Sequence, residues 1–242
     1  MQSILQLPKS WKAYYFESID STNSELLRMA RHSAVHGTVV IADQQTQGRG
    51  RQQKHWESPL GNLYFSFLID CNVEQAPLLS FITIVSLAQA IEIEVGHQVS
   101  SLSFKWPNDL LNQGQKVAGI LLEYAPDSNQ VVIGLGVNLS TAPVSEVGYP
   151  IGCLKHLSIE RQDLIGMVCS EFSKNFIHLK DYGFSEFRHL WLQRAKGIGK
   201  NISIKIGKDC ISGIFRGISN SGELELVDSV GEVKIFSAGE VL

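Results

Sequence analysis

Val117-Ala118-Gly119-Ile120-Leu121-Leu122-Glu123-Tyr124, followed by Val131-Val132-Ile133-Gly134-Leu135-Gly136-Val137-Asn138-Leu139, is the stretch that determines the fold class. Both runs are almost wholly apolar, which is typical of strands buried inside a sheet. Asp127-Ser128-Asn129 between them consists of residue types that favour turns. We therefore predict two central strands side by side. The glycines inside these strands indicate places where a ligand or another part of the chain approaches the backbone closely.

Further elements are predicted on both sides of this pair. Apolar runs or alternation predict strands at residues 38–42, 63–69 and 101–106. Helices are predicted from a capping box at residues 22–25, at 78–95, along 164–179 with a stop at Gly183, and at 185–195. The apolar run 78–95 contains Gln89, Glu92 and Glu94, so we interpret it as a buried helix and not as a membrane span.

The pattern changes near Lys196. From Gly197 onward the chain has short strand-like runs at residues 202–206, 211–218, 224–227 and 233–236, separated by turn residues. Evenly spaced short strands predict a small β-barrel of about 45 residues. We expect a first domain over residues 1–195 and a second over residues 196–242.

Composition narrows the functional class. The formal net charge is −3, which argues against a protein that binds mainly nucleic acid. The four cysteines are scattered without paired spacing, as in a reducing compartment, and do not form a metal-binding pattern. The N-terminus shows no cleavable signal pattern, so a cytoplasmic location is expected.

A basic loop follows the predicted strand at residues 38–42. It reads Gln45-Thr46-Gln47-Gly48-Arg49-Gly50-Arg51-Gln52-Gln53-Lys54-His55-Trp56. Glycines allow the backbone to approach a ligand, and arginine can bind phosphate through two hydrogen bonds at once. The loop therefore predicts a phosphate site, although it is not a P-loop because no Gly-Lys-Ser or Gly-Lys-Thr follows.

Five motifs occur in a fixed order along the chain. They are Ser21-Thr22-Asn23, Gly48-Arg49-Gly50-Arg51, Lys105-Trp106-Pro107-Asn108-Asp109, Lys116-Val117-Ala118-Gly119-Ile120-Leu121 and Gly134-Leu135-Gly136-Val137-Asn138. In this order they resemble the biotin protein ligase family, over roughly residues 18–242. One departure is visible, because Gln52-Gln53-Lys54 stands where the family usually continues Arg-Gly-Arg.

The resemblance implies an α+β fold: a mixed β-sheet flanked by helices, like the class II aminoacyl-tRNA synthetases, with a small C-terminal SH3-like barrel. It also implies a two-step reaction. The biotin carboxylate attacks the α-phosphate of ATP, pyrophosphate leaves, and the biotinyl-5′-AMP then acylates a lysine amine of a biotin carboxyl carrier protein. Magnesium is implied by the ATP chemistry, and no metal-ligand cluster is predicted.

Roles for individual residues follow from the same resemblance. The catalytic candidates are Lys116, Arg49, Arg51 and Asp109. The biotin site comprises Ser21, Thr22, Asn23, Gln45, Gly48, Arg49, Gly50, Arg51, Lys116, Gly119, Leu121, Gly134 and Gly136. The ATP site comprises Arg49, Arg51, Trp56, Lys105, Asn108, Asp109, Lys116 and Asn138.

Lys116 would reduce the repulsion between the carboxylate and the α-phosphate and stabilise charge in the transition state. The loop that carries Arg49 and Arg51 would close over the adenylate and exclude water. Asp109 would orient the incoming amine or a magnesium-bound water.

Three other functions remain open from the sequence. A lipoate or octanoate ligase or transferase shares the implied fold. A biotin-responsive repressor would need an N-terminal DNA-binding module, and the Ser21-Thr22-Asn23 motif begins too early for one, so a monofunctional ligase is expected. An inactive adenylate binder is the third, because of Gln52-Gln53. No nucleic acid or membrane partner is expected, and the chain is expected to be a monomer or a homodimer formed through a sheet edge.

Overall fold

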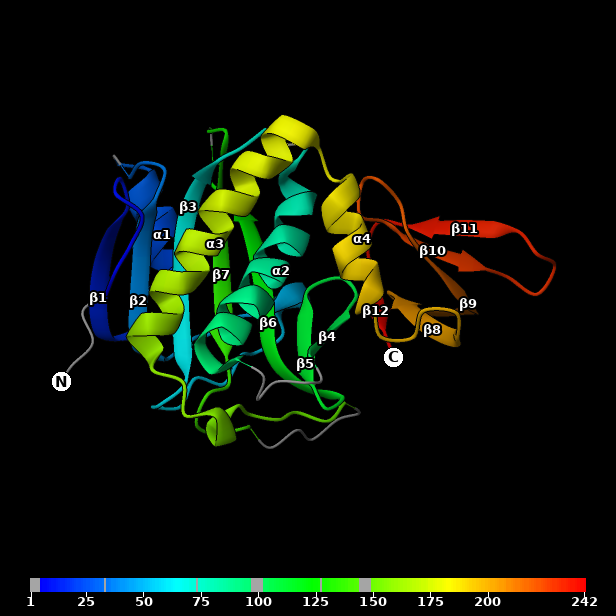
Figure 1. Ribbon diagram of the computed structural model, residues 1–242, viewed down its shortest axis with the longest axis horizontal. Coiled ribbons are helices and arrows are strands. Elements are labelled where there is room, and N and C mark those ends of the chain that lie inside the picture. The colour runs from blue at the N-terminus through cyan, green and yellow to red at the C-terminus, as the bar shows by residue number, and fades with distance from the viewer. Residues whose placement is uncertain (1–4, 33, 73, 97–101, 127, 144–148) are drawn as a thin grey trace.

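A computed structural model describes residues 5–32, 34–72, 74–96, 102–126, 128–143 and 149–242. A seven-stranded mixed sheet, in the order β1-β2-β3-β7-β6-β5-β4, forms the centre of the larger unit (Figure 1). Only β1 and β2 pair in parallel, and every other neighbouring pair is antiparallel. Its strands are β1 (Lys12–Ile19), β2 (Thr38–Gln45), β3 (Leu63–Asp70), β4 (Leu102–Lys105), β5 (Asp109–Asn112), β6 (Gln115–Tyr124) and β7 (Gln130–Val137).

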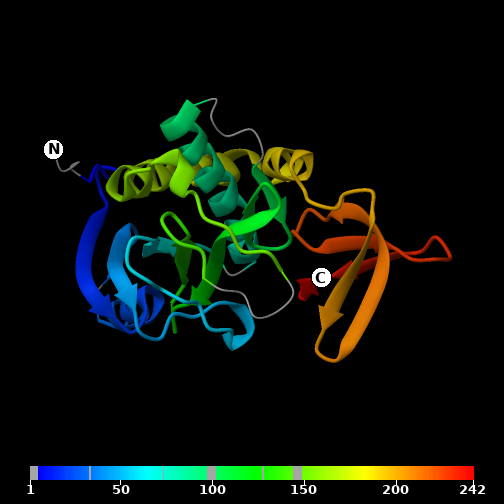
Figure 2. The ribbon, with the colours of Figure 1, turned by 90° about the horizontal axis from the view of Figure 1, so that it is seen from below.

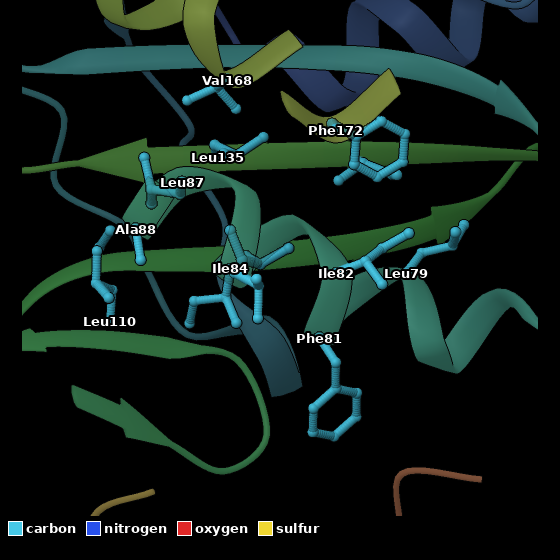
Figure 3. Packing of buried hydrophobic residues seen from close by; sticks show 14 of the residues in the cluster. Leu79, Phe81, Ile82, Ile84, Leu87, Ala88, Leu110, Leu135, Val168 and Phe172 are labelled. Carbon is cyan, nitrogen blue, oxygen red and sulfur yellow. The ribbon is translucent and has the colours of Figure 1, made fainter. Parts of the chain in front are cut away.

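Helices cover both faces of this sheet. One face, with Ile41, Phe67 and Ile133, packs under α2 (Ala76–Val95) and α3 (Arg161–Tyr182) and forms the main apolar core (Figure 3). The alternate residues Val40, Leu68 and Val132 form a second apolar cluster with Leu26 of α1 (Thr22–Ala30) on the opposite face. Successive side chains of a strand point to opposite faces, so each strand supplies both layers.

A second unit is a five-stranded antiparallel sheet in the order β11-β10-β9-β8-β12, which lies at one end of the molecule (Figures 1 and 2). Its strands are β8 (Asn201–Ile206), β9 (Asp209–Ile218), β10 (Leu224–Val227), β11 (Val233–Phe236) and β12 (Glu240–Val241). It follows α4 (Ser185–Gln193). The two units are joined by a buried hydrogen bond of 3.0 Å that the Trp106 indole donates to the Gly222 carbonyl.

The predicted α+β architecture is confirmed. The predicted pair of central strands is confirmed, because β6 and β7 are adjacent antiparallel strands. Asp127 of the predicted turn between them lies outside the described residues. The predicted buried helix is also confirmed: α2 is long and apolar enough to cross a membrane, but 72% of its most apolar 18-residue window is buried. The domain boundary near Lys196 stays a prediction.

Other details differ from the predictions. Strands β1 and β12 were not predicted, and β5 begins at Asp109, the last residue of the predicted Pro107-Asn108-Asp109 turn. The capping box is wrong: Ser21 is the N-cap of α1, and no side chain caps the helix. The Thr22 hydroxyl instead faces the sheet, where it bonds the Gln45 side chain.

Candidate functional site

Three glycines form the floor of a cavity on the α1 face of the large sheet. The register aligns them in two rows across the strands: Ser66, Gly134 and Leu121 in one row, and Tyr64, Gly136 and Gly119 in the next. The cavity above them has a volume of about 300 Å³. Its walls come from α1, the basic loop, the residues after β4 and the C-terminal strand β12.

Two of these glycines make room for side chains of the chain itself. A Cβ atom at Gly134 would lie 2.1 Å from the Asn23 Oδ1 atom, and a Cβ atom at Gly136 would lie 2.4 Å from the Trp56 indole. At Gly119 the nearest Trp56 atom would be 3.1 Å away. Asn23 therefore lies directly over the first row, and Trp56 lies over the second.

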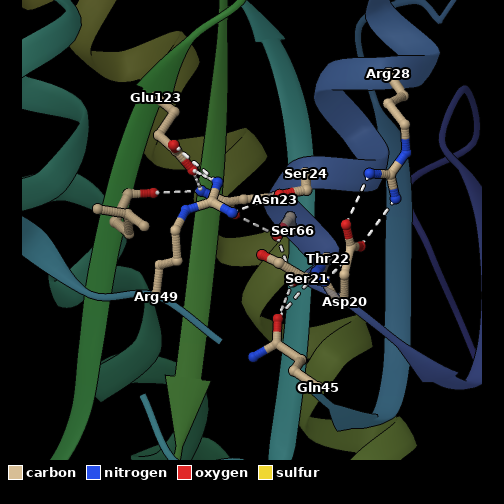
Figure 4. A network of polar contacts seen from close by, with 11 residues as sticks. Asp20, Ser21, Thr22, Asn23, Ser24, Arg28, Gln45, Arg49, Ser66 and Glu123 are labelled. Atoms are coloured by element: carbon tan, nitrogen blue, oxygen red, sulfur yellow. Dashed lines mark hydrogen bonds and ion pairs between the residues drawn. The ribbon is translucent and has the colours of Figure 1, made fainter. Parts of the chain in front are cut away.

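A polar network surrounds Asn23 at one end of the cavity (Figure 4). The Ser66 hydroxyl donates to Asn23 Oδ1 at 2.5 Å, and the Thr22 amide and hydroxyl both donate to Gln45 Oε1, at 2.9 and 3.2 Å. Asn23, Thr22 and Ser66 are all buried, and buried polar groups of this kind hold fixed directions. This end can therefore bind a polar ring through oriented amide and hydroxyl groups.

The opposite end is cationic. Lys116 forms an ion pair with Asp109 at 2.6 Å, so its charge is balanced in this structure. Lys105 is 7% exposed, and its ammonium lies 3.6 Å from the centre of the Tyr149 ring, a cation–π contact. Burial lowers the pKa of Lys105, and the nearby Asp109 opposes that shift only in part.

Arg51 is the second cation without a close counter-charge. It forms no hydrogen bond or ion pair with any residue of the described ranges. Burial lowers its pKa, while the charges of Asp109 and Glu240 act in the opposite direction. A buried cation that lacks a paired anion is costly unless a ligand supplies the negative charge. Together Arg51 and Lys105 make this end of the cavity suitable for phosphates.

The basic loop is folded back on itself over the cavity. The Gly50 amide donates to the Lys54 carbonyl at 2.7 Å, and the Trp56 amide donates to the Gly48 carbonyl at 2.9 Å. Lys54 also forms an ion pair of 2.6 Å with Glu240 of β12, which connects the loop to the second unit. The loop is thereby held at both its base and its tip.

Gln52 and Gln53 at the loop tip both have left-handed backbone angles, with φ values of 55° and 59°. This conformation favours glycine, and the departure from the family pattern lies at these two residues. The tip therefore stores backbone strain that glycine would relieve.

Two asparagines border the cationic end. Asn138 is fully buried, donates to the Gly152 carbonyl at 3.1 Å, and leaves its Oδ1 atom without a partner among the described residues. Asn108 donates to the Ile120 carbonyl at 2.6 Å and so ties the start of β5 to β6. Asn138 therefore offers a buried acceptor to a ligand.

Apart from Gly48, every residue that the sequence predicted for the site lines this one cavity. Gly48 instead lies under the loop, where a Cβ atom would meet the Trp56 carbonyl at 2.4 Å. Sequence reasoning missed Tyr149 and Glu240, since both come from segments that carry none of the five motifs. It also gave no role to Glu123, which appears there only as the second-to-last residue of the quoted run 117–124. Within the described ranges no group of three His, Cys, Asp or Glu side chains could hold a metal ion.

The fold thus places a cationic end beside a polar pocket within one cavity. Residues 15–138 match the model of the Biotin/lipoate A/B protein ligase family, and residues 197–242 match that of the Biotin protein ligase C terminal domain. The chain therefore belongs to the biotin protein ligase family.

Individual relatives agree with this assignment. The chain is 34% identical to a biotin–[acetyl-CoA-carboxylase] ligase of Paracoccus denitrificans, over 92% of this chain and 96% of that protein. It is 31% identical to the bifunctional ligase/repressor BirA of Bacillus subtilis, over 93% of this chain and 72% of the relative. A solved structure of the Aquifex aeolicus biotin protein ligase, in complex with biotin and ATP, superposes with a TM-score of 0.81 at 28% identity, covering 96% of this chain and 97% of that one.

Proposed function

We propose that this chain activates biotin with ATP and transfers it to a lysine of a biotin carboxyl carrier protein. The observation that carries the proposal is a pair of cations, the partly buried Arg51 and the buried Lys105, which line the cavity beside the Lys116–Asp109 pair and have no ion-pair partner among the described residues. Such a site is prepared for a polyanion, and the neighbouring pocket around Asn23 suits a neutral polar ring. A nucleotide triphosphate and biotin together meet both requirements.

In the first step a biotin carboxylate oxygen attacks the α-phosphorus, and the bond to pyrophosphate breaks. Two anions must approach each other, so cations between them lower the barrier. Lys116 extends from β6 between the glycine floor and Asp109, and its ammonium is proposed to lie between the two reactants. Arg51 and Lys105 would hold the phosphates, and Asn138 Oδ1 offers an acceptor to the nucleotide. Magnesium would be carried by the phosphates, since the donors at hand form no cage of their own.

In the second step the carrier amine attacks the acyl carbon and AMP leaves. The amine must lose a proton, and Asp109 is the carboxylate closest to Lys116 in the site. Before this step the mixed anhydride must be shielded from water, and the loop from Gly48 to Trp56 already covers the cavity in this structure. Asp109 is thus proposed to accept or orient the proton of the incoming amine.

The partner is proposed to be a biotin carboxyl carrier protein, because the Paracoccus denitrificans relative is named for the acetyl-CoA carboxylase that it modifies. A cytoplasmic location is proposed on the same family relationship. A lipoate ligase is the weaker alternative: the family model includes lipoate enzymes, but the C-terminal unit matches the biotin ligase model specifically.

The test is transfer of labelled biotin to a purified carrier domain with ATP and magnesium, with labelled lipoate in a parallel reaction. Replacement of Lys116 by alanine is expected to reduce kcat by a factor on the order of 1,000, as for removal of one transition-state donor. Lys174→Ala is a matched control, because that lysine pairs with Glu171 on the exposed face of α3. Transfer by Lys116→Ala at the rate of the control would refute the role of Lys116, and transfer of lipoate alone would refute the assignment of the substrate.

A further inference from the structure

Glu123 is an acidic residue of β6 that does not line the cavity but contacts two residues that do. It stands opposite Val132, one row beyond the Gly134 row, on the α1 face of the sheet. One carboxylate oxygen accepts a hydrogen bond of 2.7 Å from the Asn23 amide nitrogen. The same carboxylate accepts two bonds of 2.9 Å from the Arg49 guanidinium (Figure 4). Side chains of Arg49 and Glu123 are each 27% exposed, so the pair is shielded from most of the solvent.

The bond to Asn23 determines which way the Asn23 amide points. Ser66 donates to its oxygen, and Glu123 can only accept, so the amide nitrogen must face the carboxylate. The reverse orientation would set the amide oxygen against a carboxylate. Glu123 therefore fixes the orientation of a side chain at the ring end of the cavity.

The bonds to Arg49 connect that end to the basic loop. Arg49 donates hydrogen bonds to Glu123 on β6 and to the Ser24 hydroxyl on α1. In the loop it directly precedes Gly50 and Arg51. An ion pair with two hydrogen bonds is directional as well as strong. The position of the loop and the orientation of Asn23 therefore depend on one carboxylate.

We propose that Glu123 is a positioning residue that couples recognition of the biotin ring to closure of the loop over the active site. The proposal rests on the proposed function, because it assigns the ring end to biotin. A ligand bound against Asn23 holds the Asn23–Glu123 contact in place, and this keeps the carboxylate directed at Arg49. Occupancy of the ring end thus stabilises the closed loop before biotin is activated.

Glu123→Gln tests this coupling, because it removes the negative charge and replaces one acceptor oxygen by an NH2 group, which cannot accept from Arg49 or Asn23. The KM for biotin is expected to rise about tenfold, because the charge-assisted hydrogen bond that orients Asn23 is weakened, while kcat changes by less than about threefold. Loop closure is measured by the rate of trypsin cleavage after Arg49, Arg51 and Lys54. Saturating biotin is expected to slow this cleavage in the native chain but not in Glu123→Gln.

Ser24→Ala separates the effect on the loop from the effect on biotin binding, because the Ser24 hydroxyl accepts a hydrogen bond from Arg49 and makes none with Asn23. It is expected to weaken biotin's protection of the loop and to leave the KM for biotin within about twofold of native. Glu171→Gln breaks an ion pair of 2.6 Å on α3 and controls for loss of a surface charge. Glu123→Asp keeps the charge but retracts it by one methylene group, and is expected to lie between native and Glu123→Gln.

The outcomes distinguish this proposal from the proposed function. A native chain that transfers no biotin to the carrier refutes the function itself. If the native chain transfers biotin and all Glu123 variants match it in KM and in loop protection, the coupling is refuted while the function stands. If Glu123→Gln does not fold, an unchanged KM and unchanged protection in Glu123→Asp give the same refutation.

Discussion

Alanine substitutions at the three floor glycines should have graded effects, since the space above each glycine differs. In Gly134→Ala the new methyl would lie 2.1 Å from Asn23 Oδ1, a distance that no real contact allows. Asn23 must then rotate away and lose its bonds to Ser66 and Glu123. Loss of one neutral and one charge-assisted hydrogen bond in a buried site amounts to about 3 kcal/mol.

The expected result for Gly134→Ala is a fall of about 3 kcal/mol in the free energy of unfolding and a rise of at least tenfold in the KM for biotin. Gly136→Ala displaces the Trp56 ring, which lies at the cavity surface, so the KM should rise while the free energy of unfolding falls by less, roughly 1 kcal/mol. Gly119→Ala meets Trp56 at 3.1 Å and the flexible end of Lys116 at 3.4 Å, and should be nearly neutral for stability. Denaturant unfolding and steady-state biotinylation measure the series. Equal effects at all three positions, or an unchanged KM in Gly134→Ala, would refute this account of the floor.

Two other predictions concern the loop and the cationic end. Gln53 has a φ of 59°, a backbone angle that valine tolerates poorly. Trypsin should therefore cleave Gln53→Gly within about twofold of the native rate and Gln53→Val about fivefold faster, as expected for about 1 kcal/mol of added strain. Equal cleavage rates for the Gly and Val variants would contradict a strained loop tip. Burial lowers the pKa of Lys105, so its charge is lost as pH rises through a value below the usual 10.5, and kcat/KM for ATP should fall on that alkaline limb. The cost of burying the charge is present at lower pH and is relieved over the same rise, so the contribution of Lys105 to folding stability should increase there. Lys105→Gln should lack this alkaline limb, and an identical limb in that variant would assign it to another group.

The central strands and long helices were predictable because their signals are local. The run from Val131 to Leu139 has no polar residue before Asn138, and so short an apolar run after turn residues is typical of a strand buried on both faces. The five motifs likewise identified the residues that line the cavity, although they lie on separate elements. These residues could be assigned to one site because the order of the motifs along the chain resembles a known family. The sequence spacing between the motifs would not have been enough by itself.

What could not be predicted depends on register and on long-range contacts. β1 pairs in parallel with β2, and its exposed outer edge gives it a mixed polar sequence without clean alternation. Thr22 was interpreted as a helix cap because only its neighbours in sequence were visible, whereas Ser66, which it meets across the sheet, is far away in the chain. Tyr149 and Glu240 carry no motif, and they reach the site only because the second unit and residues 149–152 lie against it.

The basic loop shows why residue type and spacing could not assign every role. Arg49 and Arg51 were predicted to bind phosphate together because they flank Gly50 in one glycine-rich motif. In the structure Arg49 points to Glu123 and Ser24 at the ring end, while Arg51 lies within reach of the charges of Asp109 and Glu240 at the other. Among the described residues Arg49 has an ion-pair partner and Arg51 has none, so a phosphate gains more from Arg51. Arg51 is therefore the arginine suited to bind the nucleotide. Arg49 is suited to link ligand binding at the ring end to the position of the loop, through its ion pair with Glu123.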